Sequence, residues 1–143
     1  MTGDVRSICV IVAAKNASDT IATAIKSALA ETEVSEVIVI DDGSTDATSA
    51  IASGCDDGTG RLKVERFDHN RGPSAARNHA ISISSAPLIS ILDADDFFFK
   101  SRFAAMLESD DWDLVADNIA FIQQSVTGAS SMQPARFMPE EHF

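Results

Sequence analysis

The chain has 143 residues, of which 45% are hydrophobic and 23% charged, as is typical of a single soluble globular domain. Its formal net charge is −11, which argues against nucleic-acid binding, because that function needs clustered lysine and arginine. The longest apolar run, residues 8–14, is too short to span a bilayer, and no secretory signal opens the chain. Two distant cysteines without metal-ligand spacing fit a reducing compartment. We therefore expect a cytoplasmic protein whose only membrane contact is peripheral, at the inner membrane.

The predicted elements alternate between strand and helix from the start of the chain. Residues 7–13 form a continuous β-branched run, as expected of a strand covered on both faces. A helix capped by Ser18 follows, and its apolar residues recur at three- and four-residue spacing: Ile21, Ala24, Ile25, Ala28 and Leu29. Residues 36–40 repeat the pattern of the first strand. A short helix then begins at a polar cap within 44–46 and stops at Gly54.

The alternation continues in the next part of the chain. Residues 62–67 alternate between apolar and polar, which indicates a strand with one wet face or an edge position. A helix begins at Pro73 and ends before Pro87, with an apolar side made of Ala76, Ala80, Ile81 and Ile83. Residues 88–92 are predicted to be a buried strand. The last predicted elements are a helix at 101–108, which buries Phe103, Met106 and Leu107, and a fifth strand at 113–116 that extends towards Ile122.

This order of elements predicts a mainly parallel sheet with helices on both faces, that is, a Rossmann-like α/β fold. In such folds ligands bind beyond the carboxyl ends of the strands. The acidic motifs of the sequence fall at those ends. Residues after 123 show no convincing periodicity.

A cluster of carboxylates, Asp93-Ala94-Asp95-Asp96, follows the fourth predicted strand without a spacer. Carboxylates this close repel one another and raise their pKa values unless a cation satisfies them. A hard divalent ion is the natural partner, since it binds carboxylate oxygens and keeps positions for water and phosphate oxygens. The competing interpretation, an acidic turn that caps the next helix, is the commoner one for an isolated Asp-x-Asp motif.

Two further segments fall at the same predicted sheet edge. Asp41-Asp42-Gly43-Ser44 follows the second strand. One interpretation is that a carboxylate at this place contacts the base or ribose of a nucleotide. The other is that the segment only forms a turn and caps the next helix. The segment 70–78 opens a helix at Gly72 and Pro73, and a helix N-terminus attracts phosphate. Arg77, one turn into that helix, suits a diphosphate, although an isolated arginine is more often a surface residue. Together the three segments predict a metal–diphosphate site.

The order of these segments resembles family 2 of the inverting glycosyltransferases, which have the GT-A fold. The matching segments are Val10–Asn16, Ala24–Leu29, Val37–Asp46, Asn70–Asn78 and Leu92–Asp96. Each is unspecific alone, but five in order with the usual spacing are specific. The resemblance extends to the bacterial exopolysaccharide branch of the succinoglycan type. It implies that residues 1–122 form the donor-binding GT-A subdomain, and that 123–143 are an irregular tail or the start of an acceptor half.

The resemblance also implies an activity. The family transfers a sugar from a nucleoside diphosphate to an acceptor hydroxyl with inversion at the anomeric carbon. For this chain it implies a UDP-sugar donor, with UDP-glucose favoured, and a saccharide or lipid-linked saccharide acceptor. The cofactor it implies is Mn²⁺ or Mg²⁺. Membrane-associated assembly and self-association into a homo-oligomer are left open.

Site residues follow from the resemblance position by position. The implied contacts to the nucleotide sugar are Ala13, Lys15, Asp42, Arg77 and Asp93. Of these, Asp42 contacts the uracil in a pocket lined by Ala13 and Lys15, and Asp93 lies by the ribose. Arg77 helps to hold the nucleotide sugar, and Asp95 binds the metal ion that the diphosphate holds.

The chain departs from the family pattern at a few positions. Ala13 and Lys100 stand where the family usually has proline, and Lys15 where it has an aromatic residue. The catalytic base, which takes the proton of the acceptor hydroxyl, is expected beyond residue 143, so we expect a donor-binding fragment of a longer enzyme. The alternative is a non-catalytic nucleotide-sugar-binding or scaffold domain of the same fold. A dinucleotide-binding or nucleotidyl-transferring enzyme is disfavoured because the glycine-rich phosphate motifs are missing, and a receiver domain because the first strand lacks an acidic pair.

Overall fold

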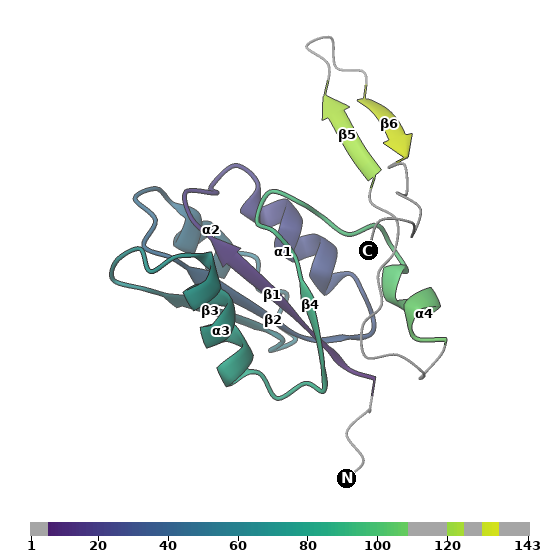
Figure 1. Cartoon of the computed structure of the whole chain (residues 1–143), viewed down its shortest axis with the longest axis horizontal. Coiled ribbons are helices and arrows are strands. Elements are labelled where there is room, and N and C mark those ends of the chain that lie inside the picture. Colours follow the sequence, from purple (N-terminus) through teal and green to yellow (C-terminus); the bar gives the residue numbers. More distant parts are fainter. Residues whose placement is uncertain (1–5, 109–119, 125–129, 135–143) are drawn as a thin grey trace, which may run out of the picture. The chain divides into compact units, whose positions relative to one another are not determined.

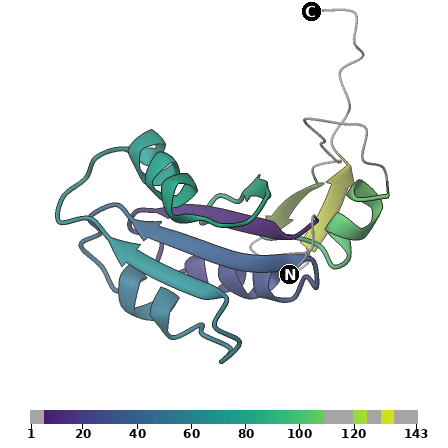
Figure 2. The same ribbon diagram turned by 90° about the horizontal axis from the view of Figure 1, so that it is seen from below.

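The computed structural model describes residues 6–108, 120–124 and 130–134, and the chain divides into two compact units, Met1–Leu107 and Glu108–Phe143. The first unit contains a sheet of four parallel strands in the order β3-β2-β1-β4 (Figure 1). Helix α3 packs against β1 and β2 on one face of this sheet, and helices α1 and α2 cover the other face (Figure 2). The predicted Rossmann-like parallel sheet with helices on both faces is therefore confirmed.

The elements of the first unit follow the predicted alternation. In chain order they are β1 (Ile8–Ala14), α1 (Ile21–Leu29), β2 (Val34–Asp41), α2 (Thr48–Ser53), β3 (Leu62–Arg66), α3 (Pro73–Ile83), β4 (Leu88–Ile91) and α4 (Arg102–Met106). The ends differ from the predicted ends by a few residues.

The core lies on the two central strands, because helices cover both of their faces. The fully buried residues of these strands include Cys9, Val10, Ile11, Val12, Val37, Ile38, Val39 and Ile40. The predicted apolar face of α1 is buried as expected, with Ile21, Ala24, Ile25 and Ala28 inaccessible to solvent. Strand β3 lies at an edge of the sheet and alternates between half-buried and exposed residues, as its sequence indicates.

Strand β4 corrects the prediction of a buried strand. It lies at the other edge of the four-stranded sheet, and Ile89 and Ile91 are 42% and 53% exposed. A run of apolar residues indicates a strand that can be buried, but neighbouring elements decide whether each face is covered. Ile81, predicted to lie on the apolar side of α3, is also exposed. It lies about 100° around the helix from Ala80, which faces the core.

The helix caps differ from those expected. The N-cap of α1 is Thr20 and not Ser18. The backbone N–H of Ser18 donates instead to Asp46 Oδ2 at 3.2 Å. Helix α4 begins after Ser101, and there the cap comes from a distant residue. The buried carboxylate of Glu31 accepts a hydrogen bond from the Ser101 N–H at 2.8 Å. Long-range contacts therefore fix helix ends that sequence patterns assign to local residues.

The second unit contains an antiparallel pair, β5 (Ala120–Gln124) and β6 (Ser130–Pro134). The predicted fifth strand at 113–116 lies outside the described residues. Two predictions stay open: the division of the chain at 122/123, and the assignment of residues 123–143 to an irregular tail or to the start of an acceptor half. Among the described residues, no helix has the length and apolar character needed to cross a membrane.

Candidate functional site

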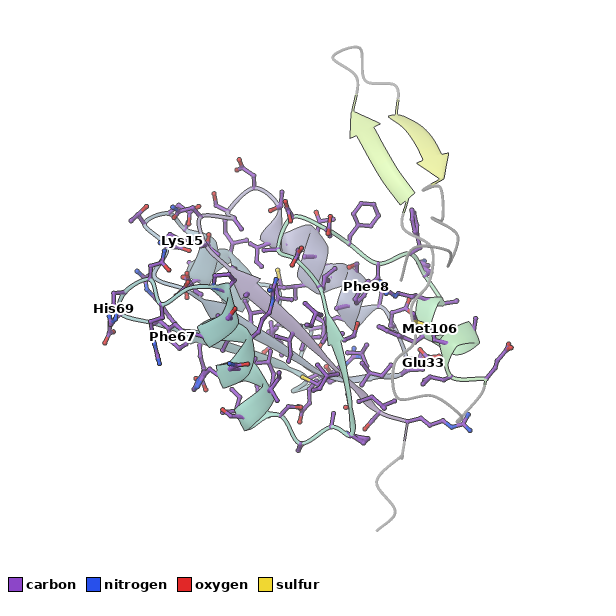
Figure 3. The ribbon with its side chains drawn as sticks, viewed as in Figure 1. Lys15, Glu33, Phe67, His69, Phe98 and Met106 are labelled. Atoms are coloured by element: carbon purple, nitrogen blue, oxygen red, sulfur yellow. The ribbon has the colours of Figure 1, made fainter. Side chains whose placement is uncertain are left out.

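The residues predicted to form the site gather at the carboxyl ends of the parallel strands. Lys15 follows β1 and His69 belongs to the loop after β3, whereas Glu33, before β2, lies at the opposite end of the sheet (Figure 3). Asp42 follows the last residue of β2, and Asp93 comes two residues after β4. Parallel strands bring these distant parts of the sequence to one edge.

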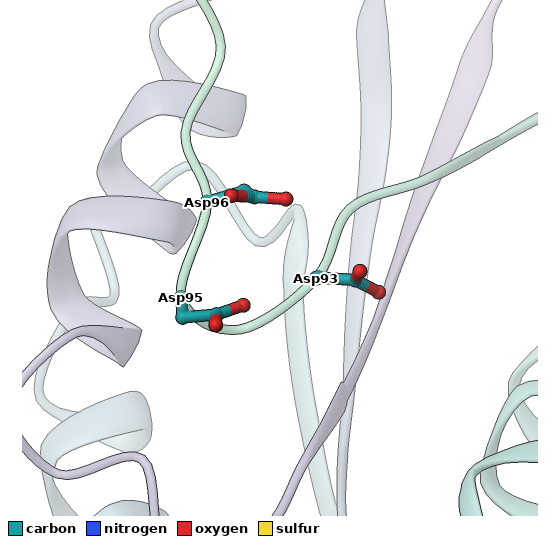
Figure 4. Close-up of side chains that lie close together, drawn as sticks. All are labelled: Asp93, Asp95 and Asp96. Atoms are coloured by element: carbon teal, nitrogen blue, oxygen red, sulfur yellow. The ribbon is translucent and has the colours of Figure 1, made fainter. Parts of the chain in front are cut away.

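Asp93, Asp95 and Asp96 form an acidic cluster on the turn after β4 (Figure 4). One carboxylate oxygen of each lies within 4.8 Å of the others, and all three residues are exposed. The Asp96 N–H closes the turn by donating to the Asp93 carbonyl oxygen at 3.0 Å. Burial raises the pKa of Asp96, and the charges of Asp95 and Asp93 raise it further. These all-oxygen donors fit a hard divalent cation, which would remove the mutual repulsion of the carboxylates.

Arg77 brings positive charge to the acidic cluster. It projects from α3, and its Nη2 donates to Asp93 Oδ1 at 2.9 Å. The two side chains are 34% and 57% exposed, so solvent screens the pair and its contribution to stability is small. The Nε of Arg77 is buried and has no hydrogen-bond partner among the described residues. The guanidinium is therefore only partly satisfied by Asp93.

Asp42 connects the end of β2 to the start of α3. It is 4% exposed, and its Oδ1 and Oδ2 accept hydrogen bonds from the backbone N–H groups of Arg71 at 2.6 Å and Gly72 at 2.9 Å. Gly72 is the N-cap of α3, with φ of +92°. The structure thus shows Asp42 bound to the loop, and its predicted uracil contact stays a prediction.

Ala13 and Lys15 lie near Asp42 in the sheet. Ala13 is half-buried and pairs with Ile40 of β2, and Lys15 is exposed directly after β1. The Asp42 N–H donates to the carbonyl oxygen of Ala14 at 2.8 Å, which ties the two strand ends together. The three residues assigned to the base therefore share one edge of the sheet.

Sequence reasoning missed a network that holds the loops after β1 and β2 together. The Asn16 N–H donates to Ser44 Oγ at 2.9 Å, and Asn16 Oδ1 accepts from the Thr45 N–H at 2.8 Å. The Thr48 N–H donates to Asp46 Oδ1 at 3.0 Å, and the Thr48 hydroxyl donates to the same oxygen. The hydroxyl bond is the main reason that the pKa of Asp46 falls to about 2. One signal was available: asparagine tolerates the left-handed conformation that Asn16 adopts, with φ of +49°.

A parallel sheet with helices on both faces and an acidic turn at the carboxyl end of a strand define a Rossmann-like α/β domain, a class of fold in which ligands bind beyond the carboxyl ends of the strands. The model of the family "Glycosyl transferase family 2" matches residues 9–141. The chain belongs to glycosyl transferase family 2, as the five sequence segments predicted.

Relatives and solved structures agree with this assignment. The chain is 58% identical to the succinoglycan biosynthesis protein ExoU of Rhizobium meliloti over 132 residues, which are 92% of the chain and 39% of that protein. It is 42% identical to ExoO of the same organism over 108 residues, 75% of the chain and 30% of that protein. The chain thus spans well under half of the length of either relative. The crystal structure of Staphylococcus aureus TarS 1–349 is similar with a TM-score of 0.58 and 31% identity, over 64% of this chain and 28% of that one. These similarities confirm the predicted GT-A fold and succinoglycan-type branch.

Proposed function

We propose that this chain is the donor-binding part of a metal-dependent, inverting glycosyltransferase of exopolysaccharide biosynthesis. The reaction would transfer a sugar from a UDP-sugar to a growing polysaccharide or a lipid-linked oligosaccharide. The observation that carries the proposal is the acidic cluster of Asp93, Asp95 and Asp96 beside the guanidinium of Arg77. Carboxylates that can hold a divalent cation next to an arginine suit a diphosphate, because the cation and the arginine both attract phosphate oxygens.

Asp95 is the metal ligand that we propose, with Mn²⁺ or Mg²⁺ as the ion. When bound, the ion neutralises negative charge that develops on the leaving diphosphate. Asp93 lies beside Asp95 in the acidic cluster and is assigned to the ribose. Arg77 has donors that Asp93 does not use, so we assign its guanidinium to the diphosphate.

The base is assigned to Ala13, Lys15 and Asp42. Lys15 is exposed, and its aliphatic stem can cover an apolar ring face while its ammonium group stays in water. UDP-glucose is the donor that we propose. In support, the chain is 34% identical over 98 residues, 68% of its length, to an Escherichia coli protein named as a UDP-Glc β-1,3-glucosyltransferase, WfaP, and covers 38% of that protein. The related TarS has been solved in complex with UDP-GlcNAc. We assign no catalytic base to the described residues.

The proposal is tested by calorimetric titration of the folded chain with UDP and UDP-glucose, with and without Mn²⁺. We expect binding that requires the ion, and an Asp95→Asn variant that weakens Mn²⁺·UDP binding about tenfold or more, the loss of one charge-assisted ligand. Asp56→Asn removes the same charge from the exposed loop before β3 and is the matched control, with binding unchanged. Metal-independent binding, or none, in a well-folded sample would contradict the proposal.

Transfer itself is tested on a chain of the relatives' full length, supplied with UDP-glucose and an oligosaccharide or lipid-linked acceptor. Formation of a glycosylated product supports the proposal that the full-length protein is a glycosyltransferase. Donor binding without any transfer supports the alternative of a nucleotide-sugar-binding scaffold.

A further inference from the structure

We propose that Asp42 is a positioning residue, whose carboxylate fixes the start of α3 and thereby sets Arg77 against Asp93. This role is separate from contact with a base. It rests on the proposed function in one respect, namely that Arg77 and Asp93 belong to the donor site. Three successive contacts link Asp42 to that pair.

The first contact is the fork between Asp42 and the loop before α3. The carboxylate is almost fully buried, and its two oxygens accept from two successive backbone N–H groups, those of Arg71 and Gly72. Hydrogen bonds to an ionised acceptor are roughly twice as strong as neutral ones. The Gly72 N–H also donates to Asn70 Oδ1 at 2.9 Å, so the loop is bound from both sides.

The second contact is the close packing of this loop on the turn after Asp42. A Cβ added at Gly43 would lie 2.8 Å from backbone atoms of His69 and Asn70, which leaves no space between the two segments. The chain then enters α3 through Gly72, at φ of +92°, and Pro73 at the first helical position. The loop therefore has little freedom to change the direction in which the helix starts.

The third contact is that of α3 with the sheet. Ala76 and Ala80 are inaccessible to solvent and pack into the apolar cluster that contains Ile11 and Ile38. Their small side chains let the helix lie close to the strands, and Arg77 follows Ala76 directly. The 2.9 Å bond from Arg77 to Asp93 depends on the rotation and translation of this helix. A change at the start of α3 would move the guanidinium.

Pyrophosphate separates this role from a base contact, because it carries the diphosphate charge and has no uracil. An effect of Asp42 on the binding of Mn²⁺·pyrophosphate must then act through the protein. If it acts through Arg77, it disappears once Arg77 is replaced by alanine. A double-mutant cycle of Asp42→Asn and Arg77→Ala measures this coupling.

Two variants perturb the linkage from different sides. Asp42→Asn places an amide NH₂ against a backbone N–H and removes one of the two bonds. Gly72→Ala strains the loop at positive φ, and its Cβ meets nothing within 4 Å, so neither Asp42 nor Arg77 is changed. Gly58→Ala, at φ of +77° and also with nothing within 4 Å, imposes the same strain on the loop between α2 and β3 and is the matched control.

We expect Asp42→Asn and Gly72→Ala each to weaken Mn²⁺·pyrophosphate binding by on the order of tenfold. This is the effect of losing one charge-assisted bond, here the bond from Arg77 to a phosphate oxygen. Neither should weaken it further in the Arg77→Ala background, and Gly58→Ala should leave it unchanged. Unchanged pyrophosphate affinity together with weaker uridine binding would show that Asp42 serves the base alone and would overturn the proposal. If Asp42→Asn does not fold, the cycle is run with Gly72→Ala.

A ligand-free measurement separates this proposal from the proposed function. The NMR signal of the Arg77 Nε–H reports the position of the guanidinium, and it should shift in Asp42→Asn and Gly72→Ala but not in Gly58→Ala. An unmoved signal overturns the positioning role. Failure of the unmodified chain to bind Mn²⁺·UDP contradicts the proposed function, while the NMR signal still decides whether Asp42 positions Arg77.

Discussion

Gly43→Ala tests the close approach between the turn after β2 and the loop before α3. Gly43 has φ of +70°, and a Cβ there would lie 2.8 Å from the backbone nitrogen of Asn70 and from the carbonyl carbon of His69. Both atoms belong to the main chain, so no side-chain rotation relieves the clash. The loop must move, and the fork that Asp42 makes with it must lengthen.

The expected loss of stability has two parts. The left-handed conformation costs an alanine about 1–2 kcal/mol relative to glycine. Forcing one extra carbon into a packed region costs about 1–3 kcal/mol more. The sum, about 2–5 kcal/mol, is a large fraction of the roughly 5–15 kcal/mol by which a domain is stable. Gly58→Ala carries only the first part, because its Cβ meets nothing within 4 Å.

Urea unfolding of the two variants measures the difference, provided that they share the same m-value. Gly43→Ala should be less stable than Gly58→Ala by about 1–3 kcal/mol, the packing part alone. Equal unfolding midpoints would refute the reasoning, because they would mean that the two segments are not held in contact.

Three further predictions concern groups outside the acidic cluster. Thr48→Val removes the hydroxyl that holds the pKa of Asp46 at about 2, so a carboxyl-carbon NMR titration should show that pKa rising towards the reference value of 3.8. The stability that ionised Asp46 contributes is complete above about pH 4 and is lost as the pH falls through about 2; stability that is flat over this range would contradict the assignment. Burial raises the pKa of Cys9 to about 11, so a thiol reagent at about pH 8 should label only Cys55 in the folded protein and both thiols in denaturant. Glu31→Ala leaves the first N–H groups of α4 without their carboxylate and should cost about 1–3 kcal/mol; hydrogen exchange in α4 that is no faster than before would argue against this cap.

The fold was largely predictable because the apolar patterns are strong. The continuous β-branched runs of β1 and β2 are typical of central strands that are buried on both faces. In α1, the three- and four-residue spacing places the apolar residues on a single face of the helix. The predictions of burial were wrong where a residue fits an apolar pattern but no neighbouring element covers it. Ile89, Ile91 and Ile81 are apolar and were expected to be buried, and all three are exposed.

The candidate site was predictable in part for a similar reason. Carboxylates that directly follow apolar strands must lie at the carboxyl edge of a parallel sheet, which places Asp42 and Asp93 without further knowledge. Their partners were not predictable. The Arg77–Asp93 pair joins residues 16 apart, and the bonds from Asp42 span about 30 positions. No local pattern encodes contacts over such distances.

The sequence by itself therefore determined the kind of domain, its family and the edge at which the charged residues gather, because strand–helix alternation and short motifs are local properties. Only the tertiary structure decided that Arg77 donates a hydrogen bond to the acidic turn at Asp93, and that the carboxylate of Asp42 accepts hydrogen bonds from the start of α3. It also decided that the loops after β1 and β2 are joined through Asn16 and Ser44. The physical reason is that hydrogen bonds and burial depend on which distant segments the folded sheet brings together.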